Sequence, residues 1–112
     1  MDLTTYDMSC LQKAKALIDA DISRHLTIDT LATKTGIGTT KLKKGFKQLF
    51  KMGLYAYLKN KRMIEAAELL SDTDKTVKQI AKATGFRYTS NFNTAFRKFH
   101  DITPLQYRIK NK

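Results

Sequence analysis

Four polar side chains lie on one face of the stretch from Gly36 to Phe50, beside a glycine turn. They are Thr40, Lys43, Lys44 and Lys47, and at about 100° per helical residue they point away from the apolar positions. Ammonium and hydroxyl groups in this pattern are what a helix that reads DNA would present to the bases and phosphates. An ordinary solvent-exposed helix face has the same composition. On this stretch alone, that simpler interpretation is slightly favoured.

The apolar residues of the same region predict the elements that position these groups. Leu42, Phe46, Leu49 and Phe50 follow the i, i+4, i+7, i+8 spacing of a buried helix face, which predicts a helix over residues 39–50. Thr27 is a suitable N-cap for a shorter helix that ends before Gly36, where a left-handed residue is expected. Helix, short turn and helix is the helix-turn-helix arrangement, whose second helix lies in the major groove of DNA.

A repeat about 50 residues later favours the DNA-reading interpretation. The first matches are spaced by 49 residues and pair Ile28, Leu31, Ala32 and Gly36 with Val77, Ile80, Ala81 and Gly85. After one inserted residue the spacing is 50, and the pairs join Thr40, Leu42, Phe46, Lys47, Leu49, Met52 and Tyr57 to Ser90, Phe92, Phe96, Arg97, Phe99, Ile102 and Tyr107. Two copies are too few for a solenoid, so the sequence predicts two equivalent modules on one scaffold.

Apolar periodicity predicts the remaining helices. We expect a frayed segment at residues 1–5, a helix over 6–21 and a central helix over 54–71, about 27 Å long at 1.5 Å per residue. Arg62 and Glu65 of the central helix are expected to be structural ion-pair formers. The second module is predicted to contain helices over 76–83 and 89–100, the latter with Phe92, Phe96 and Phe99 facing inward, and a last helix that begins near Pro104.

Composition narrows the function classes. The 112 residues carry a formal net charge of +11 and have a pI of about 9.9, the electrostatic footprint of a nucleic-acid-binding protein. No apolar run approaches the roughly 20 residues that span a bilayer, so no membrane partner is predicted. Cys10 is the only cysteine, which predicts a reducing, cytoplasmic location. His25 and His100 are isolated and phosphate-binding glycine motifs are absent, so neither a metal nor a cofactor is predicted.

Specific motifs give the chain a family resemblance over residues 11–108. These are LTIDTLATKTGI, FKQLF, YLKNKRMIEAAELL, IAKATGFRYTSNFNTAFRKF and ITPLQYR. With them the chain resembles the DNA-binding domain of AraC/XylS-type bacterial transcription regulators, and KLKKGFKQLF and TSNFNTAFRKF resemble the subgroup that controls siderophore and iron-uptake genes. The resemblance implies an all-α fold of seven helices, with two helix-turn-helix units joined by a long central helix. Residues 1–112 would form one DNA-binding domain, with units at about 6–52 and 76–110 and the linker helix at about 54–71.

The resemblance also implies roles for individual residues, with helices 39–50 and 89–100 in two adjacent major grooves. The base-contacting residues would be Thr39, Thr40, Lys43, Lys44, Thr89, Ser90, Asn93 and Thr94. The phosphate-contacting residues would be Lys47, Arg87, Asn91 and Arg97. The chemistry agrees, because Lys suits the acceptors of guanine, Asn suits adenine, and Thr can touch a thymine methyl. For Lys43 and Lys44, base and phosphate contacts are both open.

The sequence departs from the family pattern at four places. Thr94 stands where many members have Arg, and Tyr88 stands where an acidic or small capping residue is common. Lys51 and Asp101 replace the glycines that usually follow the two reading helices. Because lysine is a poor left-handed residue, strain or a shifted turn is expected at Lys51.

The predicted function is a sequence-specific DNA-binding transcription regulator that acts as an activator. Its partners would be double-stranded promoter DNA and RNA polymerase. The alternative is a protein-interaction module on the same fold with only non-specific DNA affinity. The lysine-rich first face argues against it, and the salt dependence of DNA affinity would discriminate between the two. An enzyme is not expected, because no nucleophile–base or carboxylate pair is present. An effector ligand would act only through a domain outside this chain, which is expected to be an excised C-terminal part rather than a stand-alone regulator.

Overall fold

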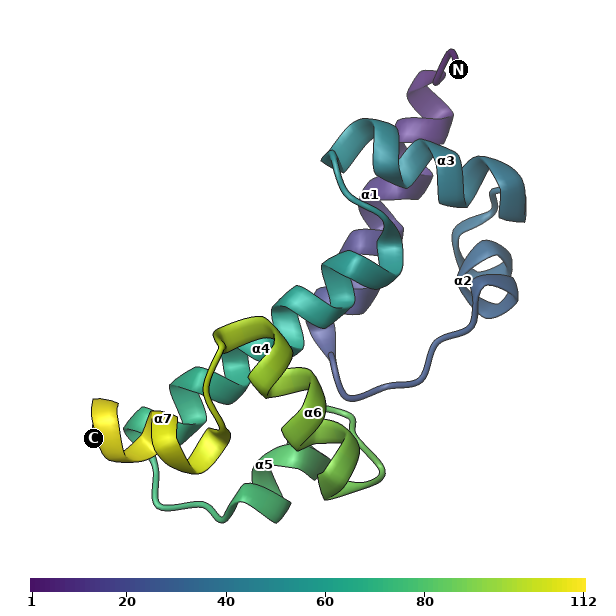
Figure 1. The fold of residues 1–112 in the computed structure, drawn as a ribbon. Coiled ribbons are helices and arrows are strands. Elements are labelled where there is room, and N and C mark those ends of the chain that lie inside the picture. Colours follow the sequence, from purple (N-terminus) through teal and green to yellow (C-terminus); the bar gives the residue numbers. More distant parts are fainter. The chain divides into compact units, whose positions relative to one another are not determined.

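The computed structural model describes residues 1–112 and contains seven α-helices and no strand. The helices are α1 (Thr5–Ala20), α2 (Ile28–Thr35), α3 (Thr39–Phe50), α4 (Leu54–Asp72), α5 (Val77–Ala83), α6 (Thr89–His100) and α7 (Pro104–Asn111). Figure 1 shows α4 as one continuous helix whose beginning follows α3 and whose end precedes α5. The prediction of an all-α fold with seven helices is therefore confirmed.

The chain forms two compact units, Met1–Lys59 and Asn60–Lys112, and the boundary between them falls within α4. In the first unit, α1, α2 and α3 pack against one another around Leu11, Leu31, Leu42 and Phe46, which are fully buried. The first turns of α4 close this core with Leu54 and with Tyr57, whose ring lies edge-on to Phe46 at 5.7 Å. Burial of these large side chains is the main stabilising term of the unit.

The second unit repeats this core with the corresponding residues. Ile80, Phe92 and Phe96 are fully buried against Met63 and Leu70 of α4. Tyr107 of α7 takes the place of Tyr57, and its ring lies edge-on to Phe96 at 5.5 Å. Corresponding side chains are thus buried in the two modules, in agreement with their predicted equivalence.

The turns repeat as closely as the cores. Thr35 and Thr84 are buried at the ends of α2 and α5, and each hydroxyl donates to the carbonyl four residues earlier, at 2.6 and 2.8 Å. Gly36 and Gly85 follow with φ of +78° and +92°, the left-handed conformation expected at Gly36. Each buried hydroxyl is therefore satisfied locally, at the point where the chain turns toward the second helix of the pair.

Two sequence-based expectations about order and burial are wrong. Residues 1–5 are not frayed as a whole: Thr4 caps α1 in a reciprocal capping box with Asp7, α1 begins at Thr5, and Leu3 packs on the first core. Phe99 does not face fully inward. It is 37% exposed and lies at the rim of the second core against the ring of His100, because Phe92 and Phe96 already fill the interior.

The two departures from glycine after α3 and α6 are accommodated without a shifted turn. Lys51 and Asp101 both adopt the left-handed conformation, with φ of 67° and 69°, and their backbone N–H groups donate to the carbonyls of Lys47 and Arg97. The strain expected at Lys51 is therefore present, as a left-handed backbone conformation at a residue that is not glycine.

No helix of the structure has the length and apolar character that crossing a membrane requires.

Candidate nucleic-acid interface

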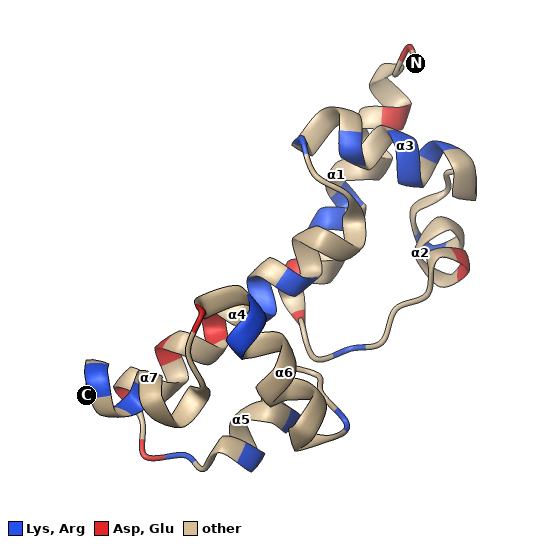
Figure 2. Ribbon diagram, viewed as in Figure 1, with Lys and Arg blue, Asp and Glu red and all other residues tan.

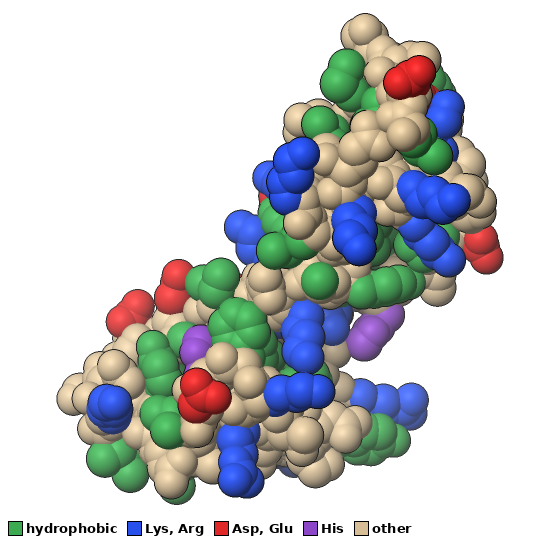
Figure 3. Space-filling view, turned by 45° about the horizontal axis from the view of Figure 1, so that its top comes forward, with side chains coloured by type: hydrophobic (Ala, Val, Ile, Leu, Met, Phe, Trp, Pro, Cys, Tyr) green, Lys and Arg blue, Asp and Glu red, His purple; other side chains and the backbone are tan.

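The outer face of α3 carries exposed polar groups along its whole length. Thr39, Thr40, Lys43, Lys44 and Lys47 are all exposed, and none of the three lysines forms an ion pair. The opposite face is closed by Leu42, Gly45 and Phe46, which are buried. In Figure 2 the basic residues recur along the α3 ribbon, and Figure 3 shows Lys and Arg side chains spread over the visible face of this unit. The arrangement could bind an anionic surface.

Lys41 differs from the other lysines of α3. Its ammonium group lies 3.0 Å from Asp7 Oδ2 of α1, and the Asp7 side chain is only 6% exposed. The backbone N–H of Thr4, at 3.0 Å, and then the Lys41 ammonium hold the pKa of Asp7 below its ordinary value. The ion pair fixes the beginning of α3 against α1.

A hydrogen bond from a second residue of α1 holds the turn before α3. The Tyr6 hydroxyl donates to the carbonyl oxygen of Gly36 at 2.8 Å. The same hydroxyl lies 2.7 Å from where a Cβ would stand on Gly36, so a larger residue there would have to displace Tyr6. Tyr6 and Asp7 therefore position the turn and the first residues of α3, and neither was singled out in the sequence. The capping-box pattern of Thr4 and Asp7 is the only local signal that could have pointed to them.

The first turns of α6 carry polar, neutral side chains on their outer face, and the exposed cations Arg97 and Lys98 follow in the last turn. Ser90, Asn91, Asn93 and Thr94 are exposed, and Thr89 is half-buried. Thr94 Oγ1 donates to the carbonyl of Ser90 at 3.1 Å, so its hydroxyl is already used within the helix. The methyl group of Thr94 remains available for an apolar contact. This face can offer amide and methyl groups, where α3 offers ammonium groups.

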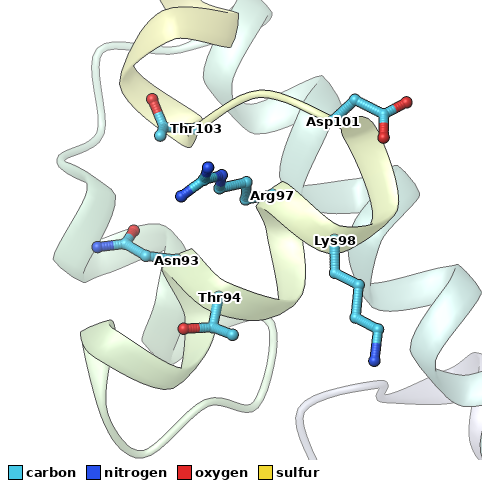
Figure 4. Close-up of a pocket in the computed structure, with 6 residues that line it drawn as sticks. All are labelled: Asn93, Thr94, Arg97, Lys98, Asp101 and Thr103. Atoms are coloured by element: carbon cyan, nitrogen blue, oxygen red, sulfur yellow. The ribbon is translucent and has the colours of Figure 1, made fainter.

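A shallow hollow of about 470 Å³ lies between the outer face of α6 and the beginning of α7. Asn93, Arg97 and Thr103 extend toward it, whereas Asp101 points away (Figure 4). The Thr103 hydroxyl accepts from the backbone N–H of Gln106 and caps α7. Two cations of α6, Arg97 and Lys98, and the amide of Asn93 thus line the hollow beside the beginning of α7. This is a suitable place for a phosphate oxygen.

The turn before α6 is held by a different side chain from the one used in the first unit. The guanidinium of Arg62 lies 2.6 Å from where a Cβ would stand on Gly85, and 5.8 Å from the Phe86 ring centre. Arg62 is half-buried, and Glu65 is exposed on the same helix. These Arg62 contacts, with a turn and an aromatic ring, are structural.

Arg87 and Tyr88 lie together at the entrance to α6. The Arg87 guanidinium lies 5.7 Å from the Tyr88 ring centre, and both side chains are exposed. Tyr88 is the N-cap residue of α6 but makes no capping hydrogen bond with its side chain. Its ring therefore supports the Arg87 cation instead of closing the helix.

The predicted residues thus fall into two groups that belong to different units. Thr39, Thr40, Lys43, Lys44 and Lys47 share the outer face of α3. Thr89, Ser90, Asn91, Asn93, Thr94 and Arg97 lie on or beside the outer face of α6, with Arg87 just before it. No group of three or more His, Cys, Asp or Glu side chains is placed to hold a metal ion.

Comparison with known proteins identifies related sequences and folds. Residues 31–110 match the family described as "Helix-turn-helix domain". The regulatory protein SoxS of Escherichia coli strain K12 is 32% identical over 98 residues, which cover 88% of this chain and 92% of SoxS. The regulatory protein PocR of Salmonella typhimurium is 34% identical over 100 residues, which cover 89% of this chain. This chain spans only 33% of the length of PocR.

A solved structure shares the fold over nearly its whole length. It is a transcriptional regulator from Chromobacterium violaceum, described among AraC-type DNA-binding domain-containing proteins. The identity is 29%, the TM-score is 0.82, and 96% of each chain is covered. The seven-helix fold is therefore shared with this regulator.

Proposed function

This chain belongs to the AraC-type family of helix-turn-helix DNA-binding domains, and we propose that it binds promoter DNA sequence-specifically through α3 and α6. The family and the fold are those of DNA-binding transcription regulators and not of enzymes. The observation that carries the finer proposal is the pair of equivalent units, each of which presents one amphipathic helix with an exposed polar face. In helix-turn-helix proteins the second helix of each unit enters the major groove.

The two helices would read two successive major grooves, so that the target site has two halves about 10 base pairs apart. At one half, Lys43 and Lys44 would donate to guanine O6 and N7 with Thr39 and Thr40 beside them. At the other half, Asn93 would pair with adenine. Support for this assignment comes from the exposure of these side chains and from the absence of ion pairs on Lys43 and Lys44.

The remaining DNA-binding residues in the proposal complete the two half-sites. Thr89, Ser90 and Thr94 complete the base-reading face of α6. Lys47, Arg87, Asn91 and Arg97 would contact phosphates, which fixes the register of each helix without carrying sequence information. The hollow shared by Asn93, Arg97 and Thr103 supports the phosphate role of Arg97.

The biological role that we propose is activation of transcription in the bacterial cytoplasm, by recruitment of RNA polymerase to the bound promoter. The related proteins SoxS and PocR are regulatory proteins, which supports a role in regulation. An effector ligand would act only through a domain outside this chain.

The test is a binding selection from a random duplex library at two salt concentrations. We expect an enriched motif with two half-sites about one helical turn apart. Binding without any enriched motif, together with a steep loss of affinity as salt rises, would instead support a module with only non-specific DNA affinity.

A further inference from the structure

Residues 1–4 lie against the second half of α3, and we call this segment the N-terminal strap. The carbonyl oxygen of Met1 accepts a hydrogen bond from Gln48 Nε2 of α3 at 2.7 Å. Leu3 is half-buried and packs on the first core. Thr4, the N-cap of α1, ends the strap and fixes the direction in which it leaves that helix. The strap therefore touches α3 at two points, one polar and one apolar (Figure 1).

Gly45 allows the strap to approach α3 closely. It is buried in the middle of α3, and a Cβ there would stand 3.2 Å from Leu3 Cδ2 and 3.0 Å from Leu11 Cδ1. Both distances are tighter than an ordinary van der Waals contact, so an alanine at this position would crowd both leucines. Glycine weakens the interior of a helix relative to alanine. Close packing of the two leucines against the α3 backbone offsets that weakness.

The second unit is built differently at the corresponding positions. Ala95 of α6 stands 50 residues after Gly45, carries the Cβ that α3 lacks and is half-buried. α4 takes the place of α1 in the second core, since buried residues of the two helices correspond at a spacing of 52, namely Leu11 and Met63, Ala14 and Ala66, and Ile18 and Leu70. At the same spacing Leu3 corresponds to Tyr55, which is 56% exposed. The repeat therefore does not account for the strap, which distinguishes the first unit.

The two strap contacts alternate with lysines of the outer face of α3. Gly45 directly follows Lys44, and Gln48 directly follows Lys47. The beginning of α3 is fixed separately, through the ion pair of Lys41. Helix ends that few contacts hold open locally more often than the packed core does. The strap is thus placed to restrain the half of α3 that carries two of the proposed DNA-binding groups.

We propose that the N-terminal strap is a positioning element of the first unit, which holds the second half of α3 in the conformation that binds DNA. Leu3 supplies the packing and the Met1 carbonyl supplies the hydrogen bond. The inference rests on the proposed function and extends it to residues that act on DNA binding only through α3. A loosened α3 has to be ordered again when DNA binds, and this ordering reduces affinity.

The experiment compares the 112-residue chain with three of its variants, Leu3→Ala, Leu3→Met and Leu17→Ala. Leu17 is the matched control, because it is also half-buried and packs on the same core from α1. Leu3→Met conserves volume and should keep the strap in place. Amide hydrogen exchange is followed by nuclear magnetic resonance without DNA. Dissociation constants are then measured on a duplex with the selected bipartite site and on two duplexes in which one half-site is randomised.

We expect Leu3→Ala to speed exchange of the Leu49 and Phe50 amides about tenfold, since it removes packing from this end of α3. Its affinity for the bipartite duplex should fall about three- to tenfold, the range expected when a few side chains must be ordered on binding. The loss should persist when the second half-site is randomised and shrink when the first is randomised. Leu3→Met should match the wild type. Leu17→Ala should unfold at a lower temperature without either effect.

Unchanged exchange at the end of α3 in Leu3→Ala, or a binding loss equal to that of Leu17→Ala, would overturn the proposal. A loss that depends on the second half-site would overturn it as well. If the wild type selects a bipartite motif and Leu3→Ala binds it equally well, only the role of the strap is refuted. If the wild type selects no bipartite motif, the proposed function fails and the role of the strap in DNA binding fails with it. The exchange rates, measured without DNA, still show in that case whether the strap holds α3.

Discussion

At the scale of single residues, the lysines of α3 have different roles although the sequence spaces them closely. Lys41 is bound to the buried Asp7, while Lys43, Lys44 and Lys47 project from the helix without partners. A lysine held by a carboxylate has already lost much of its capacity to bind phosphate. The three free lysines are therefore the ones that we assign to DNA.

Lys44→Ala tests the base-reading role. If Lys44 donates to a guanine, the substitution should cost about 1–3 kcal/mol at the cognate site and relax the preference at one base pair. The measurement is a set of binding isotherms on the cognate duplex and on its single-base variants, with Lys13→Ala as the control. Equal weakening on every duplex would show that Lys44 contacts phosphate only.

Asp7→Asn tests the anchor of α3 through the pH dependence of stability. The folded-state pKa of Asp7 lies below its ordinary value of about 3.9, because Thr4 N–H and Lys41 favour the ionised form. Its contribution to stability is therefore fully present above that ordinary value and is lost as the pH falls through the folded-state pKa.

Asp7→Asn should accordingly be less stable than the wild type at pH 7, with a smaller difference at about pH 3. Thermal unfolding followed by circular dichroism at several pH values measures this. Asp2→Asn, at an exposed aspartate, is the control and should follow the wild type. A stability difference for Asp7→Asn that does not change with pH would contradict the role of the ionised pair.

At the scale of elements, each unit is built from helices whose ends are specified by local residues. Thr4, Thr27, Thr76 and Thr103 cap α1, α2, α5 and α7 with side-chain hydrogen bonds. In α3 and α6 the N-cap residues, Gly38 and Tyr88, make no such side-chain hydrogen bond. Both helices also end at left-handed residues that are not glycine. Their ends therefore carry a small stability cost that the packed core offsets.

Lys51→Gly should remove part of that cost. Glycine adopts the left-handed conformation freely, so we expect a gain of roughly 1 kcal/mol in the free energy of unfolding. Asp101→Gly should gain less, because aspartate tolerates this conformation better than lysine. Urea unfolding at equilibrium measures both variants.

The control is Lys44→Gly, in the interior of α3, which should lose roughly 1 kcal/mol. If Lys51→Gly were no more stable than the wild type, the left-handed conformation at position 51 would not be the source of strain.

At the scale of the whole molecule, the function that we propose assigns each unit its own half of the target. Asn93→Ala should therefore change the base preference in the half-site about 10 base pairs from the one that Lys44 affects. Parallel binding selections with the wild type, Asn93→Ala and Lys44→Ala measure this. A change confined to the half-site affected by Lys44 would refute the arrangement with two grooves.

The sequence by itself determined the helices, the repeat and most of the buried residues. Leu42, Phe46, Phe92 and Phe96 could be placed in the core because a period of 3.6 residues is a local property of the chain. The polar faces of α3 and α6 followed from the same period. Thr27, Gly36 and Pro104 marked helix ends because capping and left-handed turns depend on neighbouring residues.

Only the tertiary structure decided how distant side chains meet. The sequence could not show that Lys41 pairs with Asp7, that Tyr6 bonds to Gly36, or that Arg62 lies against Gly85. These contacts join residues more than 20 positions apart, and local spacing carries no information about which helix will cover a given turn. The exposure of Phe99 has the same cause, because the number of aromatic rings that a core holds depends on the volume between packed helices.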